Sequence, residues 1–143
     1  MATNAPAAPP AWFRIAALLA ILWNAFGVFQ YLTTTGLFGD TLASLSDAQR
    51  AAAEAMPDWL YIAFAIGVLA GLVGSVNLLL RKRSAVRLLA LSLAGLAVLE
   101  GWILFASGNL EAHGGPALPV TILAVSALLL WLAIHAQKRG WLA

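Results

Sequence analysis

The sequence contains no cysteine and very little charge, since only 10% of its 143 residues are Asp, Glu, Lys or Arg. Without cysteine the chain can form no disulfide, no thiolate metal site and no thiol nucleophile. A soluble domain of this size carries about 25% charged residues, whereas 62% of this sequence is hydrophobic. Water does not tolerate that much exposed apolar surface, so the composition indicates a chain whose solvent is lipid.

Groups that carry out catalysis are sparse as well. The two histidines, His113 and His135, lie far apart in the sequence, and only Glu111 stands near His113, so no dedicated metal site is expected. No apolar stretch holds an acid–base pair, a nucleophile with its base or a metal cluster. We therefore expect no enzyme and no cofactor. The basic residues form no patch with interleaved aromatics, which argues against nucleic acid as a partner.

The central feature of the sequence is the stretch from Trp59 to Leu80, about 22 residues without a formal charge. A helix of this length crosses about 30 Å of hydrocarbon. Three consecutive cations follow, Arg81, Lys82 and Arg83, and we expect them to anchor this end on the cytoplasmic side. Together with three similar stretches, this predicts an all-α fold, an integral membrane bundle of four transmembrane helices. The expected spans are about 12–35, 58–80, 85–107 and 118–136.

Two segments outside the spans carry local signals. Residues 1–11 are small, Pro-rich and uncharged, so we expect a disordered tail ahead of a single domain over residues 12–143. In the first loop, Ser46 and Gln49 have the spacing of a capping box, and a proline follows after an alanine-rich run. This pattern predicts a short surface helix at about 47–56, which would act as a lid or spacer.

A cleaved signal peptide is the alternative interpretation of the first apolar stretch. Its positively charged region would hold only Arg14 and the terminal amine. The apolar run also exceeds the usual length of about 7–15 residues, and no clean small-x-small cleavage site follows it. We therefore favour a retained transmembrane helix.

The basic residues gather on one side of the four predicted spans, which fixes an orientation. Seven of the eight Lys and Arg residues fall beside the two termini and the turn between the second and third spans: Arg14, Arg81, Lys82, Arg83, Arg87, Lys138 and Arg139. Arg50 falls on the other side, together with Asp40, Asp47, Glu54, Asp58 and Glu111. The positive-inside rule then predicts that both termini are cytoplasmic, and it argues against dual topology.

Small residues recur at every fourth position of the second span, at Ala63, Gly67, Gly71 and Ser75. Because lipid provides no hydrophobic drive between helices, association depends on close approach and polar contacts. The ladder therefore predicts a helix-packing face. We favour its use within the bundle, and a homodimer face is the alternative.

The first span carries a stripe of small and polar residues at helical spacing. Its members are Ala17, Ala20, Asn24, Gly27, Tyr31 and Thr35. Gln30 adds a polar group near the outer end of the same span. Such a stripe faces protein rather than lipid, either to satisfy interhelical hydrogen bonds or to line a ligand pocket.

Apart from Asp58 at the edge of the second span, Glu100 is the only acidic residue inside a predicted span. It lies about 21 Å along the third span and Asn24 about 18 Å along the first, so both are expected at similar depth. An ionisable group there is costly and indicates a functional site. We predict a substrate- or proton-binding centre of Glu100, Asn24, Gln30 and Tyr31. The alternative is a structural glutamate, neutral or hydrogen-bonded to Asn24 or Tyr31.

Two segments, WNAFGVFQYLTT (Trp23–Thr34) and AIGVLAGLVGSVNLLLRKRSA (Ala65–Ala85), carry a resemblance to a known family. The chain resembles an uncharacterised family of small four-span bacterial inner-membrane proteins, sometimes loosely labelled sugar transporter. The resemblance covers the first three spans and the basic turn. It implies a bacterial inner (cytoplasmic) membrane location, and it brings no catalytic or binding residues with it.

These patterns favour a small transporter, permease-like or ligand-binding membrane protein with its polar centre at Glu100. Four spans enclose little room for a pathway, so we expect a homo-oligomer. The alternative is a non-catalytic accessory or structural subunit of a larger membrane complex. An intramembrane enzyme is the weakest class, because the spans lack a catalytic set of residues. The lipid bilayer is the partner that all three classes share.

Overall fold

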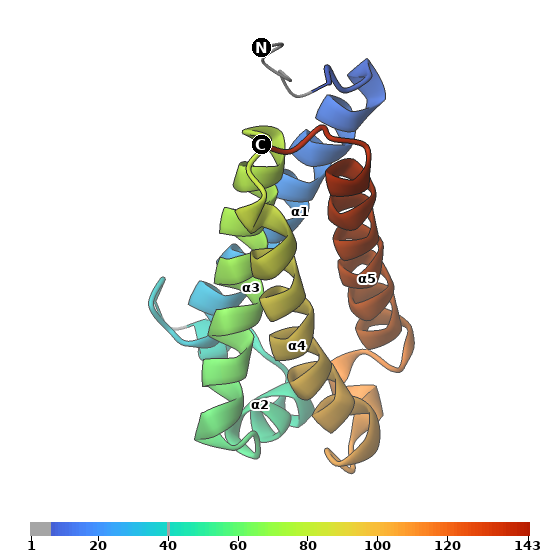
Figure 1. Cartoon of the computed structure of the whole chain (residues 1–143). Helices are drawn as coiled ribbons and strands as arrows, with labels where there is room; N and C mark the ends of the chain where they lie inside the picture. Colours follow the sequence, from blue (N-terminus) through green and yellow to red (C-terminus); the bar gives the residue numbers. More distant parts are fainter. Residues whose placement is uncertain (1–6, 40) are drawn as a thin grey trace, which may run out of the picture.

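In this computed structural model, which describes residues 7–39 and 41–143, the chain is helical, and no strand occurs in the described part (Figure 1). The elements are α1 (Ala11–Thr34), η1 (Thr41–Ser44), α2 (Asp47–Glu54), α3 (Asp58–Leu79), α4 (Ser84–Phe105), η2 (Leu110–His113) and α5 (Ala117–Lys138). Four of them, α1, α3, α4 and α5, are long and apolar enough to cross a membrane. The predicted all-α fold with four transmembrane helices is confirmed, and the protein is an integral membrane protein.

The helix bounds follow the local signals closely. Each long helix begins within one residue of its expected start. The third span ends at Phe105, earlier than expected, because the next residues leave the helix and the chain turns at Gly108 with a positive φ of 68°. Most of the expected disordered tail, residues 1–11, lies outside the described residues, and so does Asp40.

The four long helices pack in a row, α1 on α3, α3 on α4 and α4 on α5. At the end that holds both termini, α1 and α5 come together (Figure 1), and Phe13 and Ala17 of α1 share a buried cluster with Leu132 and Ala133 of α5. Toward the opposite end the two helices diverge (Figure 1). The bundle is therefore closed at the terminal end and splayed at the other.

The closest helix contact joins α3 and α4 at two glycines. A Cβ added to Gly95 would lie 2.8 Å from the Ala63 carbonyl oxygen and 2.9 Å from the Gly67 nitrogen, both backbone atoms of α3. The Ser92 hydroxyl, one turn away, donates to the Gly67 carbonyl at 2.6 Å. The small-residue ladder of α3 thus packs inside this chain, because Gly67, Gly71 and Ser75 are all buried against α1 and α4.

Arg81 ties both terminal segments to the turn between α3 and α4. It adopts a left-handed backbone conformation, with φ of 62°. Its Nε donates to the Trp141 carbonyl at 2.8 Å and its Nη2 donates to the Ala7 carbonyl at 2.8 Å. The backbone amide of Ala143 adds a hydrogen bond to the Arg81 carbonyl at 2.6 Å. Arg81 is thus a structural clamp as well as one of the basic residues at this end.

A small helical lid covers the opposite end of the bundle. The capping box at the start of α2 is present: Gln49 N donates to Ser46 Oγ at 3.3 Å, and Ser46 N donates to Gln49 Oε1 at 3.1 Å. The helix ends at Glu54, two residues before the expected 56, because Pro57 disfavours helical geometry in the residue that precedes it. Tyr61 of α3 donates to the Ala53 carbonyl at 3.2 Å and fastens α2 to the bundle.

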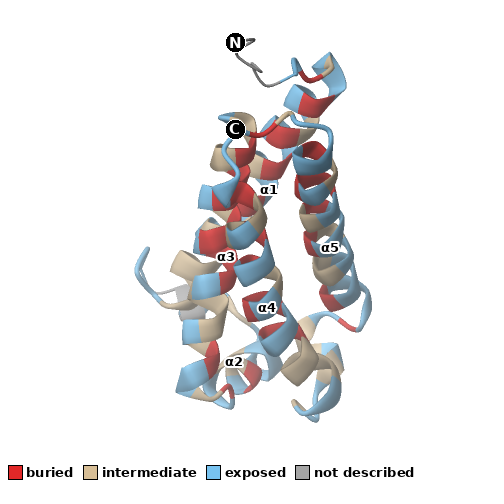
Figure 2. Cartoon of the chain, in the orientation of Figure 1, coloured by how far each residue is buried: buried red, intermediate tan, exposed pale blue. Residues whose placement is uncertain are grey.

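The outer faces of the long helices are apolar and exposed. Many large side chains are about half-exposed or more, such as Ile15, Leu19, Leu22, Leu69 and Leu128. Buried residues run along the inner faces of the bundle instead (Figure 2). Because an exposed apolar belt of this kind is stable only against hydrocarbon, the same faces that would aggregate in water contact lipid here.

Candidate functional site

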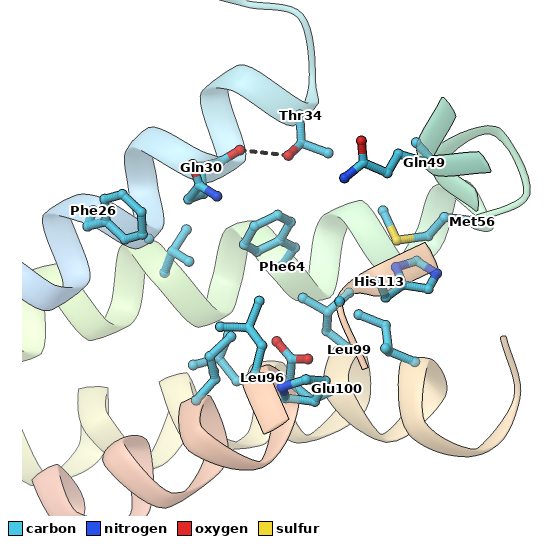
Figure 3. A pocket seen from close by; sticks show the side chains of 18 of the residues that line it. Phe26, Gln30, Thr34, Gln49, Met56, Phe64, Leu96, Leu99, Glu100 and His113 are labelled. Carbon is cyan, nitrogen blue, oxygen red and sulfur yellow. Dashed lines mark hydrogen bonds between the residues drawn. The ribbon is translucent and has the colours of Figure 1, made fainter. Parts of the chain in front are cut away.

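A cavity of about 620 Å³ occupies the splayed half of the bundle. Side chains of α1, α3, α4 and α5 form its walls, and residues of α2 and η2 close it at the lid end (Figure 3). Most of the wall is apolar, with Phe26, Phe64, Leu96 and Leu99 among its members. A concave, mostly apolar cavity of this size with a few polar groups is typical of small-molecule sites.

Glu100 is the buried polar group of this cavity. Its side chain is 4% exposed, and its carboxyl group points into the space between Phe64 and Leu96 (Figure 3). Among the described residues, no side chain or backbone group forms a hydrogen bond or ion pair with it. A buried polar group without a partner costs about 1–3 kcal/mol, and more if it is charged. Glu100 therefore carries a desolvation cost that no group in the described chain offsets.

Asn24 belongs to a separate polar layer, in which its amide nitrogen is hydrogen-bonded within the bundle. Its Nδ2 donates to the Ala20 carbonyl at 2.9 Å and to Ser75 Oγ at 3.1 Å. Asn24 and Ser92 flank Gly71, where any side chain would collide with both. Glu100 lies eight residues beyond Ser92, about 12 Å further along α4. Asn24 borders the cavity, but it forms no hydrogen bond with Glu100.

Gln30 and Tyr31 take different positions. Gln30 lines the cavity near the lid, and its backbone carbonyl accepts a hydrogen bond from Thr34 Oγ1 at 2.7 Å (Figure 3). Tyr31 does not line the cavity; its ring meets Phe64 edge-on at 5.2 Å between centroids. The structure therefore brings Glu100 and Gln30 to one cavity and leaves Asn24 at its border. Tyr31 lies outside the cavity lining, in contact with Phe64.

His113 lies at the lid end of the same cavity, on η2 (Figure 3). Its ring meets Trp102 edge-on at 6.4 Å between centroids. Burial lowers the pKa of His113 below its ordinary value of 6.5, so the imidazole is neutral at neutral pH. Among the residues that line the cavity there is no Lys or Arg. The lining therefore carries no positive charge to balance an acidic ligand.

Exposed side chains of α1 and α5 line the cavity in the half of the bundle where these helices diverge. Trp23, Phe26 and Leu118 are 37%, 59% and 54% exposed. The lid covers the end of the bundle, and the buried cluster around Phe13 closes the other end. Because these three residues lie on membrane-spanning helices, the cavity wall borders hydrocarbon there, while Gln30 and Gln49 of the lining are exposed nearer the lid.

Sequence patterns suggested a lid or spacer at about 47–56, but they did not indicate which of its residues would line a cavity or that His113 would lie at the same site. Gln49 and Met56 come from the loop around α2, and His113 comes from η2. Only the folded loops bring these segments onto α4, and no periodicity marks them in advance. Within the described ranges, no group of three His, Cys, Asp or Glu residues could hold a metal ion.

Comparison with protein-family models, with curated proteins and with solved structures finds no match for this chain. The interpretation of the site therefore depends on its geometry.

Proposed function

We propose that the protein is a permease-like, ligand-binding membrane protein whose cavity takes up a small amphiphile from the bilayer. The observation that supports this most directly is Glu100, a buried carboxyl without a partner that faces a cavity of about 620 Å³. A ligand with an apolar body fits the aromatic and aliphatic walls. Its polar head would supply the partner that Glu100 lacks.

The polar groups that line the cavity favour an amphiphile over a sugar as the ligand. A sugar needs several hydrogen-bonding groups, because each buried hydroxyl without a partner costs free energy. Asn24 Nδ2 already donates to two groups, and Gln49 Oε1 already accepts from Ser46. Thr34 is bonded to the Gln30 carbonyl. Glu100, His113 and the side-chain amide of Gln30 keep polar atoms without a partner in the described chain, but the wall around them is mostly apolar, which supports a ligand with a small polar head and a hydrocarbon body.

An accessory subunit would use its intramembrane polar residues for packing alone. Asn24, Ser75 and Ser92 meet that description, since each is hydrogen-bonded within the bundle. Glu100 does not, because it bonds to nothing in the described chain. Binding needs only one chain, whereas passage across the membrane needs a further opening at the closed terminal end. We therefore propose that a transporting form is a homo-oligomer.

Photolabelling of the purified protein in lipid nanodiscs tests cavity binding. The probe is an unbranched alkanol that carries a diazirine in mid-chain, and labelled residues are mapped by mass spectrometry. We expect labels on cavity residues such as Phe64, Leu96 and Leu99. Ile122→Trp, which places a large ring at the cavity wall, should reduce these labels by about tenfold, because the volume is then filled.

Leu128→Trp is the matched control, because Leu128 lies on the lipid-facing side of the same helix and is 58% exposed. It should leave cavity labelling unchanged. Labels confined to lipid-facing residues in every variant would contradict the proposal. A protein that copurifies with a different, larger chain and takes up no probe would favour the accessory role.

We also propose that both termini are cytoplasmic and that the membrane is the bacterial inner membrane. The two termini and the basic turn lie at one end of the bundle (Figure 1), and the segregation of Lys and Arg supports a cytoplasmic position for that end. The resemblance of Trp23–Thr34 and Ala65–Ala85 to small four-span bacterial proteins supports the location.

Single cysteines test this orientation cleanly, because the chain has none of its own. Glu54→Cys in α2 and Gln137→Cys at the end of α5 both replace exposed residues. In intact cells a membrane-impermeant maleimide should label the first variant and not the second, and both should react after the membrane is opened. Labelling of Gln137→Cys in intact cells would reverse the proposed topology.

A further inference from the structure

The geometry points to an amine as the head group of the ligand: an alkyl amine whose nitrogen meets the Glu100 carboxyl while its hydrocarbon body lies along the cavity wall. This inference rests on the proposed function and names its ligand class. Glu100 is buried, without a partner among the described residues, and aimed into the cavity (Figure 3). A carboxylate accepts hydrogen bonds only, so the complementary head group is a donor with positive charge.

The charges of the residues that line the cavity favour one class of ligand head group over the others. Glu100 and His113 are the titratable residues among those that line it. His113 is neutral at neutral pH, because burial lowers its pKa. A carboxylate ligand would face the Glu100 carboxyl with no cation to offset the repulsion. With the protonated carboxyl an alcohol forms one neutral hydrogen bond, whereas an amine takes up the proton and forms a charge-assisted one, which is roughly twice as strong.

The proton balance of binding is simple. If a neutral amine meets a protonated Glu100, one proton moves from the carboxyl oxygen to the nitrogen. If an ammonium meets a carboxylate, no proton moves, and in both cases the product is the same ammonium–carboxylate pair. An isolated buried carboxylate is costly, and an opposite charge within hydrogen-bond distance offsets that cost.

The apolar cavity walls are complementary to the hydrocarbon body of an alkyl amine. Phe64 lies near Glu100 and Phe26 lines the cavity further along (Figure 3), and aromatic faces attract cations. Leu96, Leu99 and Ile122 offer apolar surface for a hydrocarbon chain. Trp23 and Leu118 line the cavity and are exposed on membrane-spanning helices, so this side of the cavity borders the hydrocarbon, where an amphiphilic amine concentrates. Access from the bilayer and recognition by Glu100 are therefore compatible with one ligand class.

Three photoprobes test the inference: an amine, an alcohol and a carboxylate on the same diazirine-bearing chain, each added to the full-length protein in phosphatidylcholine nanodiscs. Labels on Leu96 and Leu99 are divided by labels on lipid-facing Leu91 and Val98 in the same sample, which removes differences in partitioning. We expect the amine to exceed the alcohol by at least about tenfold. Glu100→Gln should reduce the amine to the level of the alcohol.

Glu111→Gln is the control for general charge, because Glu111 is exposed on η2 and does not line the cavity. It should leave the amine preference intact. Equal labelling by amine and alcohol, or stronger labelling by the carboxylate, would overturn the amine inference while cavity binding stands. No cavity labelling by any probe would overturn the proposed function itself. A preference that persists in a folded Glu100→Gln protein would also refute the role of Glu100.

Discussion

Replacing Gly95 by alanine is expected to lower the free energy of unfolding by about 1–3 kcal/mol, and replacing it by leucine to prevent α3 and α4 from packing. The added Cβ would meet two backbone atoms of α3 at 2.8 and 2.9 Å. Backbone atoms cannot rotate away, so the helices must separate. Separation weakens the 2.6 Å hydrogen bond from Ser92 to the Gly67 carbonyl. Thermal unfolding in detergent micelles, followed by circular dichroism, measures the change.

Gly101→Ala provides a matched control on the same helix. A Cβ at Gly101 would meet no atom within 4 Å. Both substitutions gain the same helix propensity, about 0.5–1 kcal/mol, so the difference between the two variants reports the α3–α4 contact alone. We expect Gly101→Ala to be neutral or stabilising. Equal stability of the two variants would contradict the close approach at Gly95.

Replacing Glu100 by leucine is expected to raise the free energy of unfolding by about 1–3 kcal/mol and to abolish the preference for amines. The substitution removes a buried polar group that has no partner in the described chain and fills similar volume with apolar atoms, which relieves its desolvation cost. A gain in stability with a loss of function is characteristic of a residue retained for a site.

Asn24→Leu is the opposing control, since it removes a side chain that is hydrogen-bonded to Ala20 and Ser75. Loss of these bonds costs about 0.6–2 kcal/mol in a membrane, and leucine would also crowd Gly71. We expect Asn24→Leu to unfold at lower temperature than the wild-type protein and Glu100→Leu at higher temperature. If Glu100→Leu is the less stable of the two, the glutamate holds the bundle together and the structural alternative is favoured.

The transmembrane helices could be predicted because each depends only on the residues of its own segment. A long apolar stretch in lipid must satisfy its backbone hydrogen bonds internally, and a helix does so within the segment. The stretch that begins at Trp59 therefore specifies its own secondary structure, and the spacing of Ser46 and Gln49 specifies a cap in the same way. The predicted end of α2 was two residues too late, because Pro57 disfavours helical geometry in the residue that precedes it.

The site was predictable only in part. Glu100 stands out in the sequence because an acid inside an apolar span needs an explanation. Depth along the helices suggested Asn24 as its neighbour, but the splay of α1 from α5 and the tight α3–α4 contact place Asn24 against Ser75 and Gly71 instead. Depth along an axis does not specify which face meets which neighbour. The residues of the lid depend on how the loops fold back.

The sequence by itself determines that this chain is a membrane protein with four transmembrane helices. It also determines that one acidic residue, Glu100, lies in the interior of a helix that spans the membrane. Those properties depend on hydropathy and helical length, which are local. The tertiary structure decides which polar groups satisfy one another and which is left facing a cavity. That outcome depends on helix crossing and on glycine contacts such as Gly67 with Gly95. Packing pairs Asn24 with Ser75 and leaves Glu100 facing the cavity without a hydrogen-bond partner in the described chain.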